Sequence, residues 1–129
     1  MNRLIISLVT LIVVTFSQLS IAQLTEPEMT FHKLDELPAT RSDDGRESRR
    51  VVAATIGVSR VEWPAGTKTT AHNHANELVV VLLEGRLRAI SGDREFILEP
   101  GELVVLPAYV EHHYEALEDS VTLEAFGPG

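Results

Sequence analysis

The stretch AHNHANELVVVLLEGR, residues 71–86, decides the fold of this sequence. Two histidines, His72 and His74, stand one residue apart, and Glu77 follows directly before six apolar residues, Leu78 to Leu83. An imidazole is costly to place in a protein interior unless a partner uses its nitrogens. The stretch therefore predicts a buried strand that begins beside a site where histidine side chains bind something.

The sequence around this stretch indicates an all-β domain. Short runs rich in Val, Ile, Leu and Thr alternate with turns that contain Gly, Pro or Asp. Eight short strands favour a sandwich or a closed barrel over an open sheet, because closure removes unpaired edges. The expected strands span 51–63, 67–74, 77–84, 86–91, 94–98, 102–106, 111–117 and 121–126.

The length of 129 residues predicts a single domain, which we expect to span residues 51–129. Residues 23–50 are polar and poorly periodic, and they predict an N-terminal arm. Within this arm, TRSDDGRESRR (residues 40–50) is expected to be a charged loop that buries little surface.

Residues 1–22 are typical of a signal peptide. Arg3 supplies a positive charge, an apolar run extends from Leu4 to Phe16, and Ser20-Ile-Ala22 resembles a cleavage site. The apolar run is short for a membrane span, although an uncleaved N-terminal anchor is the alternative. In either case we expect the domain to be secreted or periplasmic.

The formal net charge of −8 argues against nucleic acid and anionic lipid as partners, because an acidic surface repels both. The sequence has no cysteine, so a thiolate metal site is excluded. Small all-β domains commonly pair through strands or sheet faces, and we therefore expect a homodimer.

Four of the five histidines fall in two clusters, His72/His74 and His112/His113. Side chains two residues apart on a strand project to the same face, so His72 and His74 form a pair. His112 is expected to supply a third ligand from a different strand, while His113 points the opposite way. Three imidazoles suit a divalent transition metal (Fe, Mn, Zn, Ni or Cu) better than Ca or Mg. The alternative is a pocket of hydrogen-bonding histidines without metal.

The frame around these histidines resembles the cupin family. Gly66-TKTTA-His72-Asn-His74 is similar to the opening of the first cupin motif, and Gly85 matches the glycine that ends its strand. Pro107-Ala-Tyr-Val-Glu-His112 is similar to the second motif, with Tyr109 at the usual glycine position. The resemblance covers about residues 55–126 and implies a jelly-roll β-barrel that holds a metal.

The sequence departs from the family pattern at one metal ligand. The resemblance implies a Glu or Gln four or five residues after the second histidine, where this chain has Leu78 and Val79. Glu77 stands one position early. Two interpretations stay open: Glu77 is a fourth ligand through a local shift, or it lies on the rim and the metal rests on three histidines and water.

Two further residues are candidates for proton transfer. Tyr114 shares its strand face with His112, so it is expected near the metal or in the core. On the last strand, Thr122, Glu124 and Phe126 share one face. If that face is the inner one, Glu124 is an ionisable group beside the site and a candidate acid or base; otherwise it is ordinary surface.

The tail, residues 116–129, is similar to that of small cupins associated with pectin and alginate breakdown. In those proteins an acid and a Phe on the last strand, followed by an Arg, help to open an unsaturated uronate ring. Glu124 and Phe126 match the first two positions, whereas no Arg follows and Leu78 stands at the Gln ligand position. The resemblance thus implies a shared shape without requiring the same reaction.

The sequence supports three hypotheses for function. The first is an enzyme that performs metal-assisted isomerisation or dioxygenation of a small molecule, with Glu124 or Tyr114 moving protons. The second is a non-catalytic module that binds a small ligand or a metal. The third is an inert structural cupin.

Overall fold

The computed structural model describes residues 28–127, so the expected signal peptide lies outside the described residues. One short 3-10 helix, η1 (Leu34–Glu36), precedes the strands. In the described part of the chain, no helix has the length and apolar character needed to cross a membrane. The strands are β1 (Thr40–Arg41), β2 (Glu47–Val52), β3 (Gly57–Trp63), β4 (Leu78–Glu84), β5 (Leu87–Ser91), β6 (Arg94–Leu98), β7 (Leu103–Leu106), β8 (His113–Ala116) and β9 (Ser120–Phe126).

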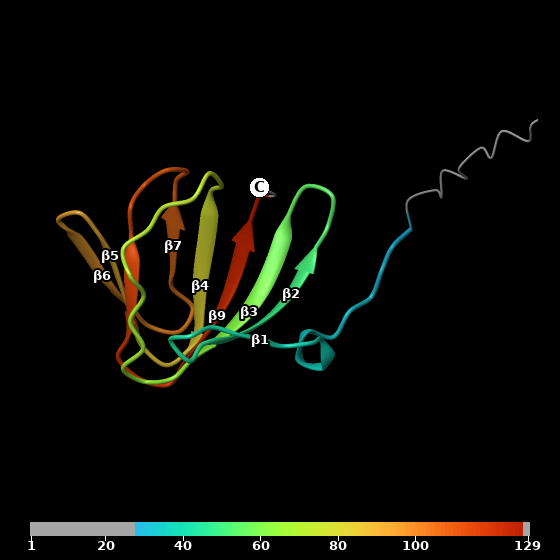
Figure 1. Cartoon of the computed structure of the whole chain (residues 1–129), viewed down its shortest axis with the longest axis horizontal. Helices are drawn as coiled ribbons and strands as arrows, with labels where there is room; N and C mark the ends of the chain where they lie inside the picture. The colour runs from blue at the N-terminus through green and yellow to red at the C-terminus, as the bar shows by residue number, and fades with distance from the viewer. Residues whose placement is uncertain (1–27, 128–129) are drawn as a thin grey trace, which may run out of the picture.

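The strands form two antiparallel sheets that face each other across the core (Figure 1). The larger sheet has the order β1-β2-β3-β9-β4-β7, and the smaller sheet has the order β6-β5-β8. The expected all-β jelly roll is therefore confirmed. The described strands do not close into one continuous barrel; isolated bridges His72–His112 and Lys68–Glu115 connect the segment before β4 with β8 and the residue ahead of it.

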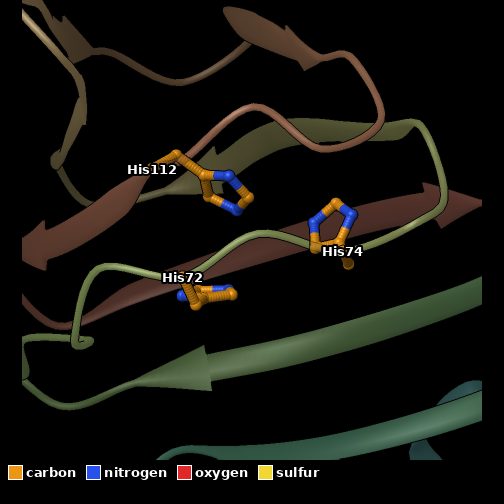
Figure 2. A group of neighbouring side chains, drawn as sticks. All are labelled: His72, His74 and His112. Atoms are coloured by element: carbon orange, nitrogen blue, oxygen red, sulfur yellow. The ribbon is translucent and has the colours of Figure 1, made fainter.

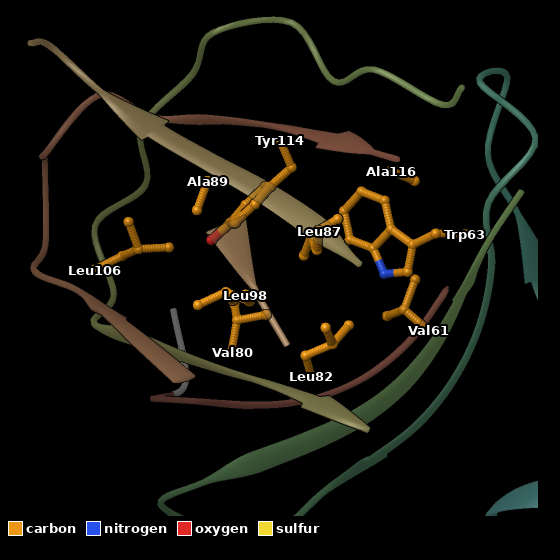
Figure 3. Packing of buried hydrophobic residues seen from close by; sticks show 10 residues of the cluster. All are labelled: Val61, Trp63, Val80, Leu82, Leu87, Ala89, Leu98, Leu106, Tyr114 and Ala116. Carbon is orange, nitrogen blue, oxygen red and sulfur yellow. The ribbon is translucent and has the colours of Figure 1, made fainter. Parts of the chain in front are cut away.

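The core lies between the sheets because strands of both present alternate apolar residues to it. On β3, Val61 and Trp63 are buried while Arg60 and Glu62 on the other face are only partly buried. The indole nitrogen of Trp63 donates a hydrogen bond of 2.9 Å to Oγ1 of the buried Thr122. Figure 3 shows the members of this cluster: Val61, Trp63, Val80, Leu82, Leu87, Ala89, Leu98, Leu106, Tyr114 and Ala116.

Residues 40–50, expected to be a loop, instead contribute β1 and most of β2. Gly45, with a φ of 90°, forms the turn between them, and Arg41 pairs with Glu47 across it at 2.8 Å. On β2, Arg49 forms an ion pair with Glu62 of β3 at 3.8 Å. The charged residues are thus compensated by cross-strand partners, and β2 crosses the expected domain boundary at residue 51.

Two other strand predictions were wrong in extent. The run 51–63 is divided, because Ala53 donates a backbone hydrogen bond to Ile56 and closes a turn between β2 and β3. The segment 67–74 is not a strand but runs beside β8 with single bridges at Lys68 and His72. Its Thr, Lys, Asn and His residues offer little apolar surface to hold a continuous ladder.

The turn between β4 and β5 depends on a glycine. Gly85 has a φ of 84°, and a Cβ there would collide with the backbone oxygen of Asp119 and with Ser120. Gly92, in the β5–β6 turn, has a φ of 59° but open space around it. Both turns need the left-handed backbone, but only Gly85 also needs the missing side chain.

We expect Gly85→Ala to lower the free energy of unfolding by about 3 kcal/mol, the sum of left-handed strain and a steric clash with backbone. Gly92→Ala, the matched control, is expected to cost about 1 kcal/mol from backbone strain alone. Urea unfolding followed by circular dichroism measures both. Equal losses in the two variants would contradict the close approach of Asp119.

Candidate metal centre

Three histidines from two distant parts of the chain meet at one end of the sandwich (Figure 2). One potential ligand nitrogen from each of His72, His74 and His112 lies within 4.8 Å of the others. The backbones of His72 and His112 form a two-way bridge, with N–H to O distances of 3.0 Å and 2.9 Å. The bridge holds the loop that carries His72 and His74 against the segment that carries His112. His113 begins β8 and is not part of the group.

The Nδ1 atom of each imidazole is occupied by a nearby backbone carbonyl. His72 Nδ1 donates to Thr70 O at 2.8 Å, His74 Nδ1 to Asn76 O at 2.6 Å, and His112 Nδ1 to Val110 O at 2.8 Å. A carbonyl oxygen can only accept, so each Nδ1 carries the proton and each Nε2 keeps its lone pair. Hydrogen bonds from the second ring nitrogen to backbone carbonyls commonly fix the orientation of metal-binding histidines in proteins.

Two of the Nε2 atoms are buried without a hydrogen-bond partner. They belong to His74 and to His112, whose side chain is 1% exposed. Burial lowers the pKa of His112, the hydrogen bond to the Val110 carbonyl partly offsets this, and the neighbouring His72 and His74 lower it further, so its imidazole loses a proton more readily than that of an exposed histidine. Unpaired buried acceptors are costly, and a cation bound by all three Nε2 atoms would remove that cost. The donor set therefore fits a divalent transition metal.

Tyr109 holds the second histidine motif against the first. It adopts a φ of 63°, a left-handed conformation that favours glycine, the usual residue at this motif position. Its backbone N–H donates to His74 O at 2.7 Å. The strained residue thus fixes the distance between the Pro107–His112 turn and the His72–His74 loop.

Glu77 and the group of histidines do not come together in the structure. Glu77 is exposed and lies outside the group of converging ligand atoms, whereas Leu78 lines the cavity beside the histidines. The reason is the alternation of β4, in which Val80 and Leu82 face the core with Leu78. Glu77 points the other way, so the arrangement favours the interpretation with three histidines over the one with Glu77 as ligand.

The histidines open into a cavity of about 520 Å³. Glu124 and Phe126 of β9 line it, together with Tyr114 of β8, so the side chain of Glu124 lies on the inner face of β9. This volume is in the range of small-molecule sites. The lining residues are Arg46, Arg50, Val52, Trp63, His72, His74, Asn76, Leu78, His112, Tyr114, Glu124 and Phe126.

A chain of hydrogen bonds holds the Glu124 carboxyl in the cavity. Thr122 Oγ1 accepts from the Trp63 indole at 2.9 Å and donates to Glu124 Oε1 at 3.1 Å. Burial raises the pKa of Glu124, and this outweighs the lowering by the Thr122 hydrogen bond and by Arg46 and Arg50. A carboxyl of this kind takes up a proton at higher pH than an exposed Glu, which suits an acid or base.

Tyr114 is 4% exposed, and its hydroxyl has no hydrogen-bond partner among the described residues. Figure 3 shows its oxygen projecting from β8 into the space between the sheets. Burial, with a smaller effect of Glu124, raises the pKa of Tyr114 far above its ordinary value. The phenol therefore keeps its proton and can donate a hydrogen bond to a ligand, but it cannot act as a base near neutral pH.

Sequence analysis missed Arg46 and Arg50, which line the same cavity. Both were assigned to a charged loop. The signal that could have identified them is the alternation Ser48, Arg50, Val52 on one face of β2 against Glu47, Arg49 and Val51 on the other.

The cupin domain model matches residues 59–126, more than half of the chain, and the chain belongs to the cupin family. The match contains His72, His74 and His112. A search of curated proteins finds no significant match.

Solved structures agree with this fold. KdgF from Halomonas sp. is 23% identical with a TM-score of 0.72, covering 78% of this chain and 95% of KdgF. An RmlC-like cupin from Shewanella frigidimarina is 14% identical with a TM-score of 0.73, covering 79% and 93%. Ectoine synthase from P. lautus is 20% identical with a TM-score of 0.70, covering 78% of each chain.

We expect protein purified without a His tag to contain close to one divalent metal ion per chain, and His72→Ala or His112→Ala to lose it. Removing one of three imidazoles leaves too few ligands for tight binding. Glu77→Gln, the matched control, is expected to keep full occupancy because Glu77 lies outside the group. Elemental analysis measures all four proteins, and loss of metal in Glu77→Gln would make Glu77 a ligand.

Proposed function

We propose that this protein is a metal-dependent enzyme that acts on a small oxygen-bearing molecule. The observation that carries the proposal is that three imidazoles with free Nε2 atoms and the Glu124 carboxyl line one cavity. A purely structural cupin has no need of either feature, and both carry a cost in stability.

The roles of the residues follow from their positions. His72, His74 and His112 would hold a divalent metal, which supplies Lewis-acid polarisation of a ligand oxygen. Tyr114 donates a hydrogen bond from the cavity wall. Leu78 and Phe126 give apolar surface for the carbon skeleton of the ligand and help to exclude water.

The presence of Glu124 in the cavity favours a reaction by proton transfer, such as isomerisation, over dioxygenation as the activity of this protein. Its carboxyl lines the cavity with the histidines, and the bond from Thr122 fixes its orientation. It can take a proton from one carbon or oxygen of the ligand and return it to another, which is the requirement for isomerisation. Fe, Mn, Zn and Ni all suit the three imidazoles, and the identity of the metal remains a prediction. Export of the protein by residues 1–22 also remains a prediction.

We expect metal-loaded protein to convert an unsaturated uronate without consuming O2, and Glu124→Gln to reduce the rate at least about 100-fold while keeping its metal. Gln retains the acceptor for Thr122 but cannot carry the proton. Ultraviolet absorbance of the conjugated double bond follows turnover, an oxygen electrode follows O2, and elemental analysis follows the metal.

Glu77→Gln is the control for this test, because it makes the same charge change three residues after His74 but outside the cavity. It should keep full activity. O2 uptake with flavonols, thiols or diketones would instead identify a dioxygenase. Metal binding without turnover of any of these compounds would support the alternative, a non-catalytic binding module.

We further propose that two copies of the chain pair through the outer face of β4, β7 and β9. Val79 pairs with Val105 and Ala125, and Val81 with Leu103 and Leu123, which gives two adjacent apolar rows on one face. Leu103 and Val105 are each 51% exposed. β7 is also the free edge of the sheet, and natural proteins usually cover such an edge.

We expect the protein to elute with twice the chain mass in size-exclusion chromatography with light scattering. Val105→Glu is expected to give a monomer, since it places a charge in one of the apolar rows beside the free edge of the sheet. A monomer for the unaltered protein across the concentration range would reject the dimer.

A further inference from the structure

Two arginines enter the metal cavity from a part of the chain that precedes the matched cupin domain. Arg46 lies just before β2, and Arg50 lies on β2. Together with Val52 they occupy the strand face that looks into the cavity of the three histidines. Two cationic side chains thus line the cavity that also contains the three histidines and the Glu124 carboxyl group.

Each guanidinium rests on an aromatic ring of the same cavity. The Arg46 Cζ lies 4.8 Å from the centre of the Trp63 ring, and the Arg50 Cζ lies 4.9 Å from that of Phe126. Trp63 is fixed by its bond to Thr122, and the Phe126 ring lies so close to Gly57 that a Cβ there would collide with it. Stacking on fixed rings orients the guanidinium planes and leaves their donor edges free.

Arg50 has no ion-pair partner among the described residues, unlike its neighbour. Arg49, on the outer face, pairs with Glu47 at 2.7 Å and with Glu62 at 3.8 Å. The Arg46 Nε donates to both oxygens of Asp44, at 3.0 Å and 2.8 Å, which leaves its terminal amino groups for other partners. Arg50 is exposed to solvent where it lines the cavity, and the carboxyl that lines the cavity with it is that of Glu124, whose pKa it lowers.

We propose that Arg50, assisted by Arg46, binds the carboxylate of a small organic acid whose other oxygens lie at the three histidines. The assignment rests on the proposed function, because the same cavity holds both ends of the ligand. A planar carboxylate matches the fork of a guanidinium. Both oxygens of one carboxylate can pair with the Arg50 fork, and the Glu124 carboxyl in the same cavity would repel the second negative charge of a phosphate dianion.

The test uses pairs of probes in which a neutral group replaces the carboxylate: D-galacturonate with D-galactose, and lactate with lactamide. Isothermal titration of metal-loaded protein is expected to show at least one acid binding about tenfold or more tightly than its neutral partner, as for a charged hydrogen bond. Arg50→Gln should abolish that preference, and Arg50→Lys should restore only part of it.

Arg49→Gln is the matched control, since it removes the same charge from the adjacent residue on the opposite face. It should keep the full preference for the acid. The proposal is wrong if neither acid binds better than its neutral partner, if Arg50→Gln retains the preference, or if inorganic phosphate binds more tightly than both acids.

His72→Ala separates this inference from the proposed function. The variant is expected to bind the acids more weakly than the unaltered protein but still in preference to the neutral probes, because Arg50 is unchanged. If the unaltered protein binds no metal yet shows the Arg50-dependent preference, the proposed function fails and the subsite stands. If it binds metal and turns over a substrate without such a preference, only the subsite fails.

Discussion

The structure of the site depends on the backbone bridge between His72 and His112. Two hydrogen bonds join them, at 3.0 Å and 2.9 Å, and Tyr109 adds a third bond to His74 O at 2.7 Å. These bonds place the side chains of two segments about 40 residues apart around one point. The carbonyls that accept hydrogen bonds from the three Nδ1 atoms then orient the rings, so metal binding would require little reorganisation of the protein.

The fold could be predicted wherever a strand is apolar on one face. β4, β5, β6 and β9 were expected at nearly their observed positions because apolar or alternating runs of residues lie between clear turn signals. β2 was missed because Glu47 and Arg49 form ion pairs with residues of the neighbouring strands and Arg50 lies over the Phe126 ring, which a single sequence does not reveal. The segment 67–74 was over-predicted, because a pattern of strand-forming residues does not show whether a continuous partner exists.

The candidate site, like the fold, could be predicted only in part from the sequence. Motif spacing predicted the three histidines, and strand alternation placed Glu124 and Phe126 on one face, but only the register of β9 with β3 and β4 showed that this face is the inner one. The position of Glu77 depended on where β4 begins, since a shift of one residue exchanges the two faces. The positions of Arg46 and Arg50 in the cavity could not be predicted, because they depend on the path of a polar segment. Such a segment has no apolar periodicity from which its structure could be read.

The loss of the fourth protein ligand and the presence of Arg50 have a common electrostatic consequence. Leu78 stands at the position where the family resemblance implies a Glu or Gln, so the three histidines would leave the charge of a divalent ion unreduced. Arg50 adds a cation, Asp44 compensates Arg46, and Glu124 is the one carboxyl among the cavity-lining residues. Such a cavity is electropositive when metal is bound, within a chain whose net charge is −8. An anionic ligand would balance the positive charge of this cavity. Its negative charge would also disfavour ionisation of Glu124 and of any other acid nearby. Binding of an acidic ligand would therefore offset the lowering of the Glu124 pKa by the metal and by Arg50, so that burial of the carboxyl continues to favour its protonated form.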